Sequence, residues 1–251
     1  MTKSETYRVA LSSLEDWDAY LIRQSGLPGP RANLELVEVA AEMGDKAQFK
    51  HWLTFTADIA PSNSPQEYLA LCGTVGLGRL VAQGKKKYLK TLRVCASDPR
   101  WRIREGVAMA LQHWGDQDFD AVIDEMETWR DGTLYEQRAI AAALCEPRLL
   151  KNPAQVKRVL KLLDGITRDF SKSKSRKSDD FIALKRGLSY CWSVAAAASP
   201  DDGKHAMEKW FGSDDPDVRA VMRENLKKDR LKRMDAAWVA RSHSELEHLQ
   251  N

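Results

Sequence analysis

Apolar residues recur with a helical period along nearly the whole chain of 251 residues. They recur at positions i, i+3, i+4 and i+7, the pattern that gives a helix one apolar face. Residues 36–43, 68–75, 107–114, 119–126 and 156–163 all follow it. No segment shows the period-two alternation that half-buried strands require. The sequence therefore predicts an all-α fold of about a dozen helices, each roughly ten to twenty residues long.

Signals for helix starts recur at regular intervals. Residues 64–67 and 133–136 have the spacing of a capping box. Three further starts place a capping side chain before a proline: Asp98-Pro99, Asn152-Pro153 and Asp215-Pro216. The predicted starts near 65, 99, 133, 179 and 216 are about 34 to 46 residues apart, which leaves room for two helices each. That interval is typical of repeats built from helix pairs.

Two of these starts share more than their turn. In residues 98–111 and 215–226 an aliphatic residue precedes an arginine, and a leucine follows seven positions later. This pattern resembles the second helix of HEAT repeats, and residues 136–144 look like a degenerate copy. The resemblance covers roughly residues 30–240. It implies a right-handed α-solenoid of about six antiparallel helix pairs, forming a single domain over residues 1–251. An ordinary helical bundle is the alternative, but period and turn chemistry agree on the repeat.

Composition limits the environment and the cofactors that we expect for the chain. The 39 basic and 36 acidic residues nearly cancel, and no apolar run approaches the ~20 residues that cross a bilayer. Four cysteines lie far apart, so metal or redox pairs are not indicated and buried free thiols are expected. We therefore expect a cytoplasmic protein that uses no membrane, metal or cofactor.

One segment interrupts the apolar pattern. Residues 171–178 are polar and basic, and they contain Lys174, Arg176 and Lys177. Such a segment cannot contribute to a core, so it is a loop or an insert. The simpler interpretation is a solvated linker between helices, and the alternative is a flexible basic finger that touches phosphate. Residues from about 241 to 251 are expected to fray as a chain end.

Eight tryptophans are many for this length, but most follow the apolar stripes and are expected in the core. Trp52, Trp114, Trp192 and Trp210 are of this kind. Trp101 is the best candidate for an exposed binding residue, because it opens a helix among basic neighbours and could form a cation–π contact. Those neighbours are Arg100, Arg102 and Arg104.

Further basic residues lie on other predicted helices, and they complete the set of candidate ligand contacts: Arg138, Arg219 and Arg223. Basic side chains spread along a helical stack could follow an acidic polymer or a nucleic-acid backbone. Taken singly, each is as well explained by a solvated helix face.

One group of HEAT-like proteins, the bacterial DNA alkylation-repair glycosylases, is enzymatic. Its signature places an aspartate four residues after a tryptophan, as Trp114 and Asp118 do here. The paired tryptophans of that motif are missing, and Gly115 is expected to end the helix between the two residues. Asp118 is the one catalytic candidate, although a carboxylate stabilised at a helix N-terminus explains it more simply.

The sequence thus favours a non-enzymatic scaffold over an enzyme. A complete helical pattern without an assembled catalytic group suggests a surface that binds a protein or an acidic polymer. A DNA-binding or DNA-repair protein is the alternative.

Overall fold

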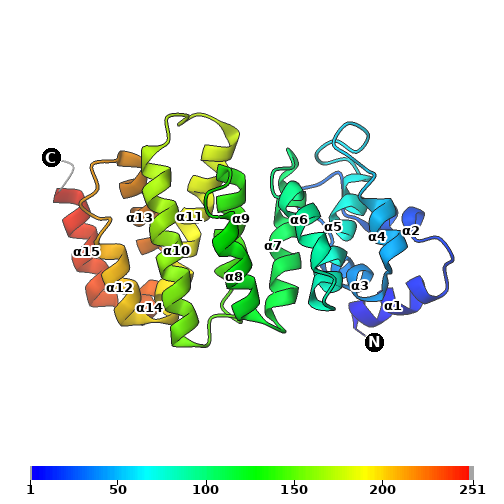
Figure 1. Cartoon of the computed structure of the whole chain (residues 1–251), viewed down its shortest axis with the longest axis horizontal. Coiled ribbons are helices and arrows are strands. Elements are labelled where there is room, and N and C mark those ends of the chain that lie inside the picture. Colours follow the sequence, from blue (N-terminus) through cyan, green and yellow to red (C-terminus); the bar gives the residue numbers. More distant parts are fainter. Residues whose placement is uncertain (1, 249–251) are drawn as a thin grey trace. The chain divides into compact units, whose positions relative to one another are not determined.

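The computed structural model describes residues 2–248, and every regular element in that range is helical. Fifteen α-helices and one short 3-10 helix are present there, without a strand, so the predicted all-α class is confirmed (Figure 1). Two compact units divide the chain after Asp118. None of the described helices is both long and apolar enough to cross a membrane.

The first unit contains seven α-helices and the 3-10 helix. Their bounds are α1 (Lys3–Ser12), α2 (Asp18–Gln24), α3 (Leu34–Met43), α4 (Lys46–Trp52), α5 (Glu67–Ala82), η1 (Lys86–Tyr88), α6 (Leu89–Cys95) and α7 (Trp101–Gly115). Helix α5 is the centre of the unit, because it contacts α2, α3, α4, α6 and α7 and is buried on nearly all sides.

Glycines let α5 approach its neighbours closely. A Cβ atom at Gly78 would lie 2.3 Å from the carbonyl oxygen of Ala110 on α7, and one at Gly76 would meet the ring of Phe49. The glycine-rich stretch of residues 73–78 is therefore a helix-packing surface.

The second unit contains eight helices. Their bounds are α8 (Phe119–Trp129), α9 (Leu134–Leu144), α10 (Pro153–Lys172), α11 (Asp179–Ala198), α12 (Pro200–Glu208), α13 (Pro216–Leu226), α14 (Asp229–Met234) and α15 (Ala236–His248). Here α11 packs against both α9 and α13, while α10 packs against both α8 and α12 (Figure 1). Alternate helices therefore form two rows in contact with each other.

Polar contacts show that alternate helices run parallel. Lys185 and Ser193 on α11 bond to Asp217 and Asn225 on α13, and both pairs are 32 residues apart. On the other row, the Arg158 guanidinium on α10 binds the Asp124 carboxylate on α8, at a separation of 34 residues. The first unit has the same spacing: the Arg102–Glu67 and Tyr68–Asn33 bonds each span 35 residues. Neighbouring helices of a row are thus offset by one sequence interval of about the predicted period.

Most predicted helix starts are confirmed. Thr133 and Glu136 form both halves of a capping box, and Asn152 and Asp215 cap α10 and α13 before their prolines. The predicted box at residues 64–67 is only half formed. Ser64 accepts a bond from the backbone of Glu67, but the Glu67 side chain is buried and accepts from Asn63 and Arg102 instead.

The predicted core tryptophans divide unevenly. Trp52, Trp114 and Trp192 are buried as expected, whereas Trp210 is only partly buried. At the C-terminus α15 continues to His248, so the described part of the tail that was expected to fray is helical. Residues 249–251 of that tail lie outside the described range.

Candidate functional site

Trp101 stands at the start of α7 with 47% of its surface exposed. It borders a hollow of about 280 Å³ in the first unit, whose wall is mostly apolar and includes Pro30, Leu34 and Leu71. The guanidinium of Arg102 lies 4.5 Å from the centre of the Trp101 ring. The exposed ring and its cation–π neighbour are therefore present where the sequence suggested them.

The arginines around Trp101 do not form a basic platform. Arg100 and Arg102 are each only 4% exposed. Arg100 binds Asp98 at 2.8 Å and donates to the carbonyls of Phe55 and Ala60, at 2.7 and 3.0 Å. Their guanidinium groups hold the unit together, so these two predicted ligand contacts are instead structural residues.

Arg102 is part of a buried ion pair. It binds Glu67 at 3.2 Å and donates to the carbonyl of Gly29 at 2.7 Å. Arg104 donates to the carbonyls of Asp98 and Pro99, at 2.6 and 2.9 Å, and so holds the turn that precedes its own helix. A guanidinium used in this way stabilises a loop and is less available to a phosphate.

The helix break that was expected between Trp114 and the catalytic candidate Asp118 is present. α7 ends at Gly115 and α8 begins at Phe119, so Asp118 lies exposed between them. Trp114 is 4% exposed, and the amine of Lys86 lies 3.4 Å from the centre of its ring. A ring covered in this way does not offer a face on which a base could stack.

The second unit carries a charged groove between α11 and α13, with a volume of about 460 Å³. The α11 wall repeats at helical spacing: Ile182, Lys185, Arg186, Ser189 and Tyr190. The ends of this stripe, Ile182 and Tyr190, are exposed apolar side chains. The groove thus combines an apolar contact surface with positive charge.

Not all cations in this groove are neutralised. Lys185 binds Asp217 at 2.6 Å, but Arg186 and Lys228 have no hydrogen bond or ion pair with any side chain between residues 2 and 248. At the end of the stripe the Arg230 guanidinium lies 4.5 Å from the ring centre of Tyr190 and donates to its hydroxyl at 2.6 Å.

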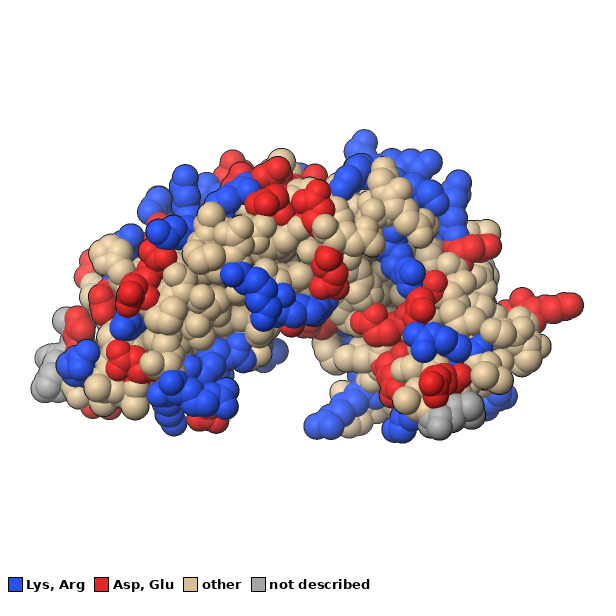
Figure 2. Space-filling view, turned by 90° about the horizontal axis from the view of Figure 1, so that it is seen from below, with Lys and Arg blue, Asp and Glu red and all other residues tan. Residues whose placement is uncertain are grey.

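Basic side chains act on the carboxylate of Glu224 in the groove lining. The pKa of Glu224 is lowered by a hydrogen bond from Lys227, and further by the charges of Lys228 and Arg223. Figure 2 shows clusters of lysine and arginine separated by acidic and uncharged residues on the face drawn.

The basic segment after α10 is anchored at one residue. Residues 173–178 connect α10 and α11, and within them Arg176 binds Asp215 and Asp217, at 2.5 and 3.3 Å. Its guanidinium also lies 5.2 Å from the ring centre of Phe181. Lys174 and Lys177 are exposed and are the part of this segment that a ligand could reach.

The other predicted contacts occupy varied positions. Arg138 on α9 is partly buried, and its stem lies where a Cβ atom at Gly187 would touch it. Arg219 donates to the carbonyl of Ser213, in the same way as Arg104 donates to Asp98, six residues back in both cases. Arg223 is partly buried beside Glu224 and makes no ion pair within the described residues.

The main residues of the groove were not predicted. Lys185, Arg186 and Tyr190 share one face of α11, and the spacing 182, 185, 186, 189, 190 is visible in the sequence. That stripe could have been found as the polar face opposite the buried residues of α11. The packing of this face against α13 could not have been predicted, because the sequence pattern does not tell which helices become neighbours.

Comparison with known protein families, with curated proteins and with solved structures finds no match to this chain.

Proposed function

We propose that this chain is a non-enzymatic binding scaffold, a right-handed α-solenoid of about six antiparallel HEAT-like helix pairs. The architecture is supported by the two rows of alternate helices and by the polar contacts that join residues 32 to 35 positions apart. Stacking of this kind leaves one face of each row free for recognition. We also propose that the protein acts in the cytoplasm.

The ligand that we propose is an acidic protein segment, bound in the α11–α13 groove. The observation that carries this proposal is a pair of cations that form no ion pair within the described residues, Arg186 and Lys228, beside the exposed ring of Tyr190. Carboxylates of a partner would neutralise the cations, and apolar side chains would cover Ile182 and Tyr190. Tyrosine and arginine are also the residue types that most often dominate binding energy.

Nucleic acid is the alternative ligand, since stacking on Tyr190 and contact with cations would suit it too. One feature favours the protein. Asp217 and Glu224 line the same groove, so a peptide with spaced carboxylates can avoid them, whereas a continuous row of phosphates cannot.

Fluorescence anisotropy with a labelled acidic peptide that contains aromatic residues tests the proposal, with duplex DNA of equal charge as the comparison. We expect the peptide to bind and the double variant Arg186→Gln, Lys228→Gln to weaken it roughly tenfold or more. The matched control is Lys174→Gln, Lys177→Gln, which removes the same charge outside the groove and should change peptide affinity little.

Two results would reject the protein ligand. If the groove variant bound the peptide as well as the wild type, the groove would not be the site. If duplex DNA bound more tightly than the peptide, with a steep loss between low and moderate salt, nucleic acid would take its place. A larger effect of the Lys174 and Lys177 control on DNA would then identify the basic segment as a phosphate contact.

A further inference from the structure

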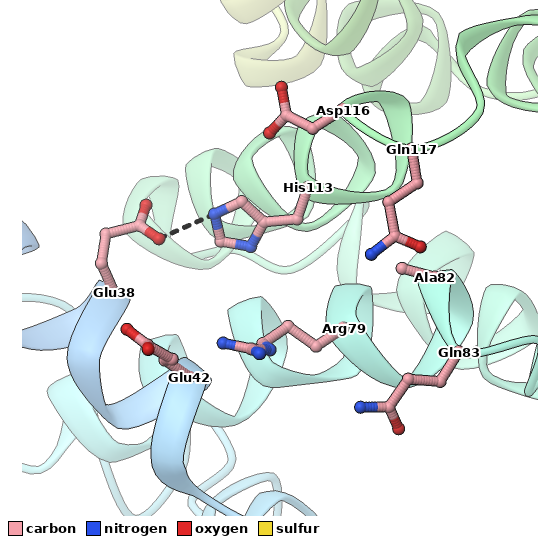
Figure 3. Close-up of a pocket in the computed structure, with 8 residues that line it drawn as sticks. All are labelled: Glu38, Glu42, Arg79, Ala82, Gln83, His113, Asp116 and Gln117. Atoms are coloured by element: carbon pink, nitrogen blue, oxygen red, sulfur yellow. Dashed lines mark ion pairs between the residues drawn. The ribbon is translucent and has the colours of Figure 1, made fainter.

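A second hollow lies in the first unit, away from Trp101, and it is polar. It has a volume of about 260 Å³ and is lined by residues in, or directly after, the C-terminal halves of α3, α5 and α7 (Figure 3). The first turns of these helices line the Trp101 hollow, so the three helices run parallel and the two hollows lie at opposite ends of their row.

Arg79 is the unusual residue of this polar hollow. It is partly buried on α5, and its side chain extends from α5 toward Glu42 (Figure 3). Its guanidinium makes no hydrogen bond or ion pair with any residue that the structure describes. A planar cation held in a concavity without a partner matches the geometry of a carboxylate, which it can bind through two parallel hydrogen bonds.

Acidic groups face the same space. The Glu38 carboxylate binds Nε2 of His113 at 2.7 Å, and the Glu42 carboxylate binds Arg8 at 2.5 Å. Each contact uses the Oε2 atom alone, so the Oε1 atom of each glutamate can still accept a hydrogen bond. Asp116 adds a third carboxylate to the lining. This density of negative charge would repel a phosphate dianion, but it suits an ammonium group.

His113 and two glutamines complete the polar lining of the hollow. Nδ1 of His113 is out of contact with solvent and has no hydrogen-bond partner in the structure. The amides of Gln83 and Gln117 supply further donors and acceptors in the lining (Figure 3).

We propose that this hollow binds a small zwitterion of the free amino-acid class. Its carboxylate would pair with Arg79, and its ammonium group would lie against Glu38 and Glu42. A volume of about 260 Å³ is below the range usual for drug-sized ligands and fits a molecule of this size. The site lies in the first unit and is independent of the groove between α11 and α13.

Isothermal titration of the whole chain with each common L-amino acid, one at a time, tests this proposal. We expect at least one to bind with a dissociation constant below the millimolar range. For that amino acid, the analogue without the amine and the analogue without the carboxylate should each bind at least tenfold more weakly. Arg79→Gln and Glu42→Gln should each weaken binding by a similar factor, because each removes one charge contact.

Lys90→Gln is the matched control for Arg79→Gln, since Lys90 is an exposed cation of the same unit outside the hollow. It should bind the amino acid as the wild type does. Arg79 has no partner to lose, so both variants should keep the wild-type circular dichroism spectrum. The proposal is rejected if no amino acid binds, if Arg79→Gln binds as well as Lys90→Gln, or if either truncated analogue equals the parent amino acid.

Discussion

Two arginines that the sequence suggested as ligand contacts instead form buried bonds that stabilise the fold. Arg100 and Arg102 flank an exposed tryptophan, yet both side chains turn inward and bond to residues that are 35 to 73 positions away in sequence. Local sequence indicates that a position is basic, but burial depends on distant segments such as Gly29 and Phe55. Trp101 itself was predicted correctly as exposed. It lies in the first turn of its helix and outside the apolar stripe, and both facts can be recognised from neighbouring residues alone.

The buried pair of Arg102 and Glu67 leads to a prediction about stability. Arg102→Met would leave the carboxylate of Glu67, which is fully buried, without its counter-charge. We expect a loss of about 3–5 kcal/mol in the free energy of unfolding. Urea unfolding followed by circular dichroism measures it, with Lys90→Met as the exposed control.

A second variant separates charge from packing at the same place. In Glu67→Gln, Arg102→Met the residual charge is gone, while the glutamine oxygen can still accept from the backbone of Asn63. At least about half of the lost stability should return. A double variant as unstable as Arg102→Met would show that the cost came from lost packing of the arginine stem and not from an unpaired charge.

At the scale of elements, the sequence predicted helices well and their neighbours poorly. Caps such as Asp215 and the box of Thr133 and Glu136 act within one turn, so they can be recognised from a few residues. The half-formed box at residue 64 shows the limit, because a tertiary contact with Arg102 draws the Glu67 side chain away. The polar hollow was not foreseen either, since its lining comes from three helices that are far apart in sequence.

Helix packing gives a second prediction, in which two glycine-to-alanine changes have opposite effects on the free energy of unfolding. Alanine raises helix propensity by about 1 kcal/mol in both cases. At Gly78 the new Cβ atom would lie 2.3 Å from the backbone of Ala110, so α5 and α7 must move apart, at a cost of about 1–3 kcal/mol. At Gly187 the nearest atom is the flexible Arg138 side chain, at 3.4 Å.

Thermal unfolding of the two variants should therefore shift in opposite directions. We expect a lower midpoint for Gly78→Ala and an unchanged or higher one for Gly187→Ala. Equal stabilisation by both changes would contradict the close contact between α5 and α7. Equal destabilisation would instead show that Arg138 cannot yield to a methyl group on α11.

At the scale of the whole molecule, the all-α class followed from periodicity, while the division into two compact units did not. The interval between helix starts runs through residue 118 without a gap, so the sequence predicted one domain over residues 1–251. Repeats of this kind are held mainly by contacts with the next repeat, and their sequence pattern has no reason to change where a compact unit ends. The single domain therefore stays a prediction that stability measurements can address.

The first unit offers the direct test. Residues 1–118 include α5 with all the helices that it contacts, and the whole lining of both hollows in that unit. A fragment of these residues should be helical, unfold cooperatively in urea and, if the polar hollow binds an amino acid, retain that binding within about tenfold. Circular dichroism and titration calorimetry on the fragment and the full chain give the comparison. In a continuous solenoid the interfaces between repeats supply much of the stability. A fragment that lacks a cooperative transition would therefore show that the repeats stabilise one another across Asp118.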